Sequence, residues 1–127
     1  MPIYDGLLFD PPAPLARVVL RDPLTGKTAA DVPMLMDSGA DVTLLPTPLI
    51  ESLGLDMDAG DEYELTAFDG STSRSRAINI DLLFLRRTFK GRFLIIDQAC
   101  GILGRDILNH LSILLNGPKR KWEEHGP

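Results

Sequence analysis

Short runs of apolar residues alternate with polar residues along most of the chain, and turn-forming residues separate the runs. Residues 15–21 and 27–37 each have the alternation and the β-branched content of a strand. Between them, residues 22–26 (DPLTG) have the composition of a tight turn, so the two segments are expected to form a hairpin. Residues 42–46 (VTLLP) predict a further short, buried strand.

A short helix is expected over residues 47–55. Thr47 is a plausible N-cap, Pro48 fits the first helical position, and Gly54 would end the helix. A second short helix is expected within residues 101–111, which open with glycines.

Two more hairpins are predicted in the second half of the chain. Residues 63–85 should form two strands joined by a turn at Asp69-Gly70, the strongest short hairpin signal present. Residues 86–97 should form another hairpin around Lys90-Gly91, and residues 112–118 a final strand. The inventory is about seven or eight strands with two short helices, a mostly β fold of the barrel or sandwich type.

The length of 127 residues fits one compact domain. The proline-rich segment at 11–14 separates an N-terminal arm, residues 1–14, from a body of residues 15–118. Residues 119–127 are expected to be a polar, solvated C-terminal tail, because a short basic run is followed by two glutamates.

The composition excludes several function classes. A formal net charge of −5 argues against nucleic-acid binding. No apolar run is long enough for a membrane span, and the N-terminus does not resemble a secretory signal. The lone Cys100 excludes an internal disulfide and suits the cytoplasm. Two separated histidines and one cysteine do not form a metal site, and we expect no cofactor.

The candidate chemistry lies in two segments. The first is Asp37-Ser38-Gly39-Ala40, which follows an apolar strand; the second is Gly-Arg-Asp at 104–106, which opens a short helix. With the hairpin between them, these segments resemble the retropepsin-like aspartic proteases, the single-domain retroviral type and its bacterial relatives. The resemblance spans most of the chain and implies that 15–118 is a protease domain. It also implies a closed β-barrel with one or two short helices and a flap hairpin.

The chemistry of carboxylates agrees with this resemblance. Two carboxylates held close share one proton, so that one member activates a water and the other donates to the scissile carbonyl. The sequence contains one such motif, so the second carboxylate must come from another chain. Asp37 is therefore the expected catalytic residue, in a homodimer that places it against its own copy and acts on a polypeptide substrate.

The resemblance assigns roles to the neighbours of Asp37. Ser38 would reach the loop of the partner chain, and Gly39 and Ala40 would let substrate approach the backbone. Asp41 and Arg105 resemble a structural ion pair under the active-site loop, with Asp41 also near substrate backbone. The same resemblance places Thr43 at the base of the loop.

The hairpin tip at Phe68, Asp69, Gly70 and Ser71 is expected to be the flap that covers the substrate. Retroviral flaps are glycine-rich and apolar at the tip, whereas this one carries Asp69 and is followed by polar residues. Two alternatives to an active protease therefore stay open. One is a catalytically weak or inactive dimeric module that binds peptide or protein, and the other is a scaffold domain in which dimerisation alone matters.

Overall fold

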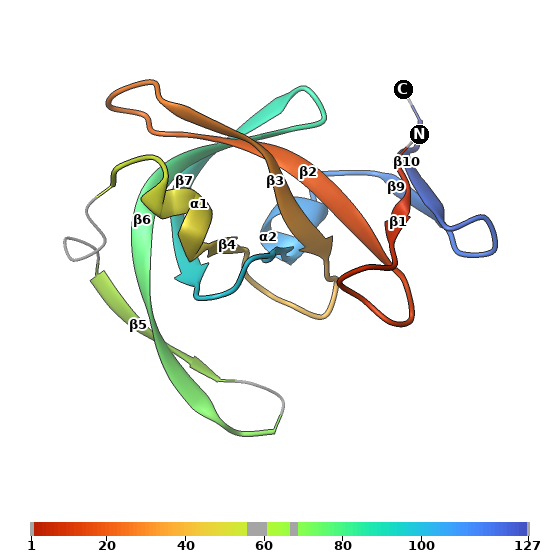
Figure 1. Cartoon of the computed structure of the whole chain (residues 1–127), viewed down its shortest axis with the longest axis horizontal. Coiled ribbons are helices and arrows are strands. Elements are labelled where there is room, and N and C mark those ends of the chain that lie inside the picture. Colours follow the sequence, from red (N-terminus) through yellow and green to blue (C-terminus); the bar gives the residue numbers. More distant parts are fainter. Residues whose placement is uncertain (1, 56–60, 67–68, 127) are drawn as a thin grey trace.

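The computed structural model describes residues 2–55, 61–66 and 69–126, with the backbone alone for residues 61–66 and 73–75. Its elements are β1 (Tyr4–Asp5), β2 (Ala13–Arg21), β3 (Thr28–Met36), β4 (Leu44–Pro46), α1 (Thr47–Glu51), β5 (Asp61–Thr66), β6 (Thr72–Phe84), β7 (Arg87–Ile96), β8 (Gly101–Leu103), α2 (Arg105–Leu108), β9 (Ile113–Asn116) and β10 (Lys121–Glu124). Figure 1 shows these elements along the chain.

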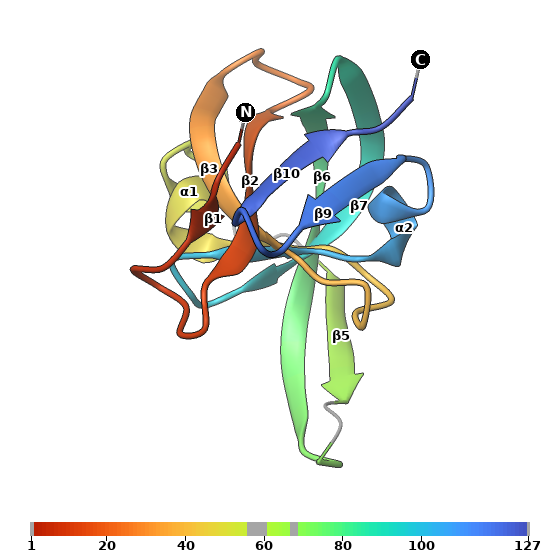
Figure 2. The same cartoon turned by 90° about the vertical axis from the view of Figure 1, so that its right-hand side faces the viewer.

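A closed barrel forms the body of the molecule. The main sheet has the order β1-β2-β3-β8-β4-β7-β6-β5. An additional pairing of β2 with β6 closes six of these strands into a ring: β2, β3, β8, β4, β7 and β6. The distal part of β6 and its partner β5 extend away from this ring as a long arm (Figures 1 and 2). The expected mostly β closed barrel with one or two short helices and a long hairpin is confirmed.

The barrel encloses one hydrophobic core because alternate residues of its strands point inward. The helices close the core with Ile50 from α1 and Ile107 from α2. The strands contribute most of its other fully buried side chains: Val18, Leu20, Val32, Met34, Leu45, Ile80, Leu82 and Leu103.

The hairpin expected around Lys90-Gly91 is wrong. Strand β7 runs unbroken through this point, and Gly91 pairs with Ile80 of β6. The chain turns earlier, at Leu85 and Arg86, where φ is +50° and +65°. Positive φ at both central residues is the signature of a tight hairpin turn, but Gly or Asn normally marks it. The long pairing of β6 with β7 therefore overrides the local turn preference.

Thr47 is not the N-cap of α1. The cap position is Pro46, and no side chain caps the helix. The Thr47 hydroxyl instead donates to the carbonyl oxygen of Ile96, over 3.0 Å. It therefore links the start of α1 to the end of β7.

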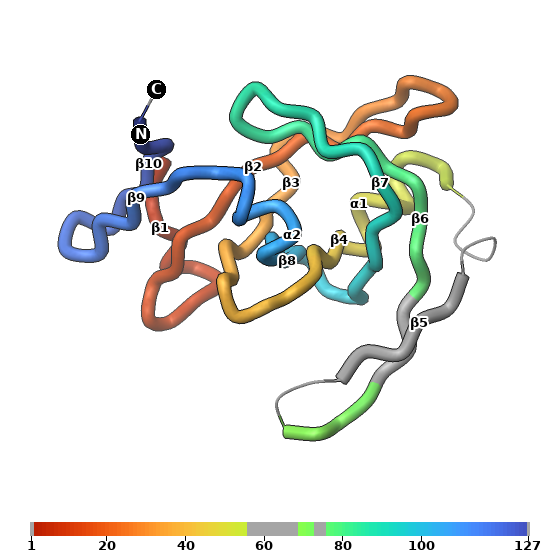
Figure 3. The backbone as a smooth tube through the Cα atoms, turned by 180° about the vertical axis from the view of Figure 1, so that it is seen from behind, coloured from red at the N-terminus to blue at the C-terminus, as the bar shows by residue number. Residues whose placement is uncertain are grey.

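The C-terminal segment is not a solvated tail throughout. Residues of β10 pair antiparallel with β9, and Trp122 is 3% exposed. The indole Nε1 of Trp122 donates to the carbonyl oxygen of Leu15, over 2.9 Å. Figure 3, seen from behind, shows β9 and β10 beside β1 at one side of the barrel. Trp122 thus anchors the polar C-terminal segment to the core. The domain boundaries predicted from the sequence, at residues 14/15 and 118/119, remain predictions.

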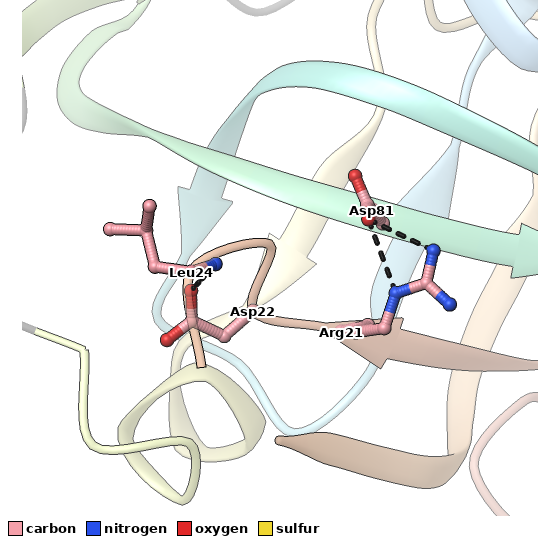
Figure 4. A network of polar contacts seen from close by, with 4 residues as sticks. All are labelled: Arg21, Asp22, Leu24 and Asp81. Atoms are coloured by element: carbon pink, nitrogen blue, oxygen red, sulfur yellow. Dashed lines mark hydrogen bonds and ion pairs between the residues drawn. The ribbon is translucent and has the colours of Figure 1, made fainter. Parts of the chain in front are cut away.

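One ion pair joins the two strands that close the ring. Arg21 on β2 stands opposite Asp81 on β6, and its Nε and Nη2 atoms donate to Asp81 Oδ2 over 3.2 and 3.0 Å. The Asp81 side chain is 8% exposed and that of Arg21 is 34% exposed. The next residue, Asp22, accepts bonds from Leu24 N–H and the Thr25 hydroxyl and so shapes the following turn (Figure 4).

Removing the charge of Asp81 should weaken the closure of the barrel. We predict that Asp81→Asn lowers the free energy of unfolding by about 1–3 kcal/mol, the usual value of a charged hydrogen bond. Urea denaturation at a fixed protein concentration measures this change. The matched control is Asp97→Asn, at an exposed position, which should leave stability nearly unchanged. Equal effects of the two substitutions would contradict the role given to the ion pair.

Candidate active site

Asp37 lies at the end of a strand that is fixed from both sides. Strand β3 pairs parallel with β8, so that Met36 stands beside Leu103. The Asp37 N–H continues this ladder by donating to the carbonyl oxygen of Leu103, over 3.0 Å. Parallel pairing therefore brings the two candidate segments, far apart in the sequence, to the same end of the sheet. Asp37 itself is half-buried.

The loop turns sharply directly after Asp37. The Ala40 N–H donates to the Asp37 carbonyl oxygen over 3.1 Å, and the Gly39 N–H donates to Asp37 Oδ1 over 2.9 Å. A Cβ atom on Gly39 would lie 3.0 Å from that same oxygen, which explains a glycine here. The turn holds the carboxylate over the loop, and the exposed Ser38 and Gly39 stand at its tip.

Gly104 allows the loop to pack directly on the start of α2. A Cβ atom at this position would approach the Val42 carbonyl oxygen to 2.5 Å, so no larger residue fits without a backbone shift. The Arg105 N–H donates to the carbonyl oxygen of Ala40, over 2.9 Å. The two sequence segments are thus in backbone contact.

A buried threonine connects the same segments through side chains. The Thr43 hydroxyl donates to Asp106 Oδ1 over 2.6 Å and accepts the Gly104 N–H over 3.1 Å. Asp106 also accepts the backbone N–H groups of Thr43 and Ile107. Thr43 is 1% exposed and its bond from the Gly104 N–H is buried, whereas Asp106 is exposed, so the network fixes the loop base from the core to the surface.

Arg105 contacts the loop differently from the expectation. Its Nη1 donates to the Ser38 carbonyl oxygen over 2.7 Å. Among the described residues, the expected ion pair between Arg105 and Asp41 is not formed. Asp41 is exposed, and the Arg105 guanidinium orients the loop through the backbone carbonyl of Ser38 instead.

The hairpin arm ends in a polar turn. Strands β5 and β6 pair up to Thr66 and Thr72, which brings Asp69, Gly70 and Ser71 to the tip. Asp69 Oδ1 accepts the Ser71 hydroxyl over 2.6 Å and the Ser71 N–H over 2.9 Å. These bonds from Ser71 lower the pKa of the exposed Asp69 carboxyl. The fourth residue expected at the tip, Phe68, lies outside the described residues.

Comparison with known proteins identifies the family. A family described as "Aspartyl protease" matches residues 24–107, more than half of the chain. The chain belongs to the aspartyl protease family. Its structure is similar to that of the retroviral EIAV protease complexed with the inhibitor HBY-793, with 25% identity and a TM-score of 0.54, over 85% of this chain and 93% of that chain. No curated protein matches the sequence.

The matched region of this aspartyl protease includes the Asp37 loop, the hairpin arm and the turn into α2. Sequence reasoning placed Thr43 at the base of the loop but assigned no role to Asp106. The missed signal was the hydroxyl of Thr43 within the apolar run of residues 42–45, since a buried hydroxyl requires a partner. Their separation of 63 residues hid the pairing.

The described part of the aspartyl protease contains no group of three or more His, Cys, Asp or Glu side chains that could hold a metal. In the same residues, no helix has the length and apolar content of a membrane span.

Thr43→Val tests the base of the loop. Valine has nearly the same shape but leaves the buried Gly104 N–H without its acceptor, so we predict a loss of about 1–3 kcal/mol in unfolding free energy. Chemical denaturation measures it, with Thr88→Val as the control because Thr88 is exposed. If the two variants were equally stable, the threonine network would not anchor the loop.

A second prediction concerns the polar turn at the arm tip. The bonds from Ser71 lower the pKa of Asp69. The ionised carboxylate therefore stabilises the turn fully at pH values above the ordinary carboxyl pKa of 3.8, and this stabilisation is lost as the pH falls through the lowered pKa. Ser71→Ala should raise the pKa of Asp69, as measured by NMR titration of its carboxyl carbon. Ser71→Thr keeps a hydroxyl and should preserve the lowered pKa. An unchanged titration in Ser71→Ala would rule out this cause.

Proposed function

We propose that the protein is an aspartic endopeptidase that hydrolyses peptide bonds of extended polypeptides as a homodimer. The observation that carries the proposal is the fixed position of Asp37. Its backbone is held by β8, its carboxylate by the Gly39 N–H, and no cationic side chain of the described residues pairs with it.

The catalytic unit is a pair of such carboxylates. One chain supplies a single Asp-Ser-Gly motif, so a two-fold axis must bring Asp37 against the same residue of a second copy. The ionised member of the pair accepts a proton from water, whose oxygen attacks the scissile carbonyl carbon. The protonated member donates to the carbonyl oxygen. Collapse of the tetrahedral intermediate breaks the C–N bond: the leaving nitrogen takes a proton from the pair, and a hydroxyl of the intermediate returns one to the pair as the new carbonyl forms.

The loop around Asp37 suits this task because it does not need to rearrange. Bonds from Arg105 to the Ser38 carbonyl and from Thr43 to Asp106 hold its two ends. A preorganised carboxylate loses little free energy in positioning when substrate binds. We therefore assign Arg105 and Thr43 as positioning residues and Ser38 as the contact to the partner loop.

The β5–β6 arm is proposed as the flap. An extended peptide lying between the arm and the Asp37 loop would gain main-chain hydrogen bonds and lose contact with bulk water. The exposed Asp41 side chain, which has no ion-pair partner among the described residues, is available to substrate backbone N–H groups at the edge of this space.

The alternative of a dimeric binding module is favoured by one observation. The flap tip carries the exposed carboxylate of Asp69, held by Ser71, instead of an apolar surface. A charged tip stays hydrated, so its closure over a substrate costs more than that of an apolar tip. Such a protein would bind extended peptide without cutting it.

Asp37→Asn decides between the two functions. We predict that the wild type cleaves denatured protein at mildly acidic pH with a bell-shaped pH–rate profile, because one carboxyl must be ionised while the other is protonated. The variant should lose all measurable cleavage while keeping its fold and its dimer. Asp97→Asn, at an exposed site, serves as the control and should cleave normally. Peptide fragments separated by mass spectrometry give the readout.

Mixing the two proteins tests the sharing of the site. In an excess of Asp37→Asn, wild-type chains should be trapped in heterodimers that hold one intact carboxylate, so that activity falls well below that of diluted wild type. Undiminished activity in the mixture, or cleavage by the variant alone, would contradict the shared site. Peptide binding without any cleavage by the wild type would favour the binding module.

A further inference from the structure

The tip of the β5–β6 arm carries a carboxylate that the arm itself does not neutralise. The register of the two strands places each glutamate of β5 opposite an arginine of β6: Glu62 opposite Arg76 and Glu64 opposite Arg74. Opposite charges at facing positions of a hairpin compensate each other. Asp69 lies in the turn beyond these pairs and, among the described residues, forms no ion pair. Its negative charge therefore stays uncompensated at the end of the arm.

The turn fixes this carboxylate and leaves one of its oxygens available. Both bonds from Ser71, from its hydroxyl and from its N–H, reach Asp69 Oδ1. Among the described residues, no donor reaches Oδ2, so this oxygen can accept a hydrogen bond from a ligand. Gly70 has a φ of +85°, and a Cβ atom added to it would contact nothing within 4 Å, so the turn is open to an approaching side chain. Because the bonds from Ser71 lower the pKa of Asp69, its carboxyl stays ionised at mildly acidic pH.

The surface opposite the arm is also acidic. Figures 1 and 2 show the arm and the loop between β3 and β4 on the same side of the barrel. This loop carries the exposed Asp41 next to the half-buried Asp37. The nearby cation, Arg105, is engaged with the Ser38 carbonyl oxygen. A peptide between the arm and the loop would thus meet carboxylates on both sides, and the net charge of −5 would further attract a cationic peptide.

Two arms must cover one substrate in the proposed homodimer. A peptide that crosses the two-fold axis is covered by one arm from each chain, so closure brings two Asp69 carboxylates towards the same segment of substrate. Their repulsion and the loss of their hydration both oppose closure. A Lys or Arg side chain of the substrate would offset both costs, because it is a cation and donates charge-assisted hydrogen bonds to carboxylates.

We propose that Asp69 is a specificity-determining residue that selects polypeptides with Lys or Arg close to the cleaved bond. The inference rests on the proposed function and names the substrate class of that same site. The cationic side chain donates to Asp69 Oδ2, while Ser71 holds Oδ1. A Glu or Asp at the same place in the substrate is rejected, because it would lie beside a like charge.

A set of matched peptides tests this selection. Cleavage sites mapped in digests of denatured proteins supply a parent peptide, in which one residue beside the cleaved bond is set to Lys, to norleucine or to Glu. Norleucine has nearly the length of Lys without its charge. We expect kcat/KM of the wild type to be about tenfold higher for the Lys peptide than for the norleucine peptide, and lowest for the Glu peptide.

Substitutions of Asp69 separate its charge from the shape of the turn. Asp69→Asn should bring the ratio of kcat/KM for the Lys and norleucine peptides close to one. Asp69→Glu keeps the charge and should preserve a ratio above one. Asp69→Lys should reverse the preference in favour of the Glu peptide. The same ratio in the wild type and in Asp69→Asn would overturn the proposal.

Glu51→Gln is the matched control. Glu51 is exposed on α1, outside the arm, so this substitution removes one negative charge without changing the tip. The variant should keep the ratio of the wild type. An equal fall of the ratio in Glu51→Gln and in Asp69→Asn would show that net charge alone attracts the Lys peptide, and would overturn the role of Asp69.

Peptide binding distinguishes failure of this inference from failure of the proposed function. Fluorescence anisotropy with the uncleaving Asp37→Asn variant should show tighter binding of the Lys peptide, and adding Asp69→Asn should remove the difference. That result without any cleavage by the wild type would support recognition by Asp69 and reject the protease. Asp37-dependent cleavage without a preference for Lys would support the protease and reject recognition by Asp69. Absence of the preference in both measurements would also reject it.

Discussion

The parallel pairing of β3 with β8 is the constraint on which the site depends. It places Asp37 beside Leu103 and, with it, the turn that leads into α2. The packing around this pairing is tight. A Cβ atom on Gly101 would lie 2.4 Å from the Met34 sulfur, and a Cβ atom on Gly104 would lie 2.5 Å from the Val42 carbonyl oxygen. Two glycines therefore allow a close approach that larger side chains would prevent.

Around this pairing, the rest of the fold acts as support. The ring closes through β2 and β6, where Arg21 and Asp81 make a partly buried ion pair. No buried side-chain nitrogen or oxygen of the described residues lacks a hydrogen-bond partner. The loop that holds Asp37 is thus built on a hydrogen-bonded frame, while the β5–β6 arm extends away from the ring.

The sequence predicted what depends on local composition and on motif. The β2–β3 hairpin and the arm with Asp69-Gly70 at its tip carry strong local signals, whereas the convergence of the Asp37 loop with the Gly-Arg-Asp segment was implied by the family resemblance. The turn at Leu85-Arg86 could not be predicted, because neither residue normally adopts positive φ and the pairing of two long strands imposes it. Likewise, the polarity of the last residues concealed β10, which one buried tryptophan attaches to the barrel. The partner of Arg105 depended on the exact loop geometry, which composition does not encode.

Under the proposed function, these features form half of an active site, and a second chain would supply the other carboxylate. The stoichiometry of a pepstatin-type transition-state mimic tests this account most directly. Calorimetric titration should saturate at one inhibitor for every two chains, and Asp37→Asn should abolish the binding. Saturation at one inhibitor per chain, or equal binding by the Asp37 variant, would contradict it.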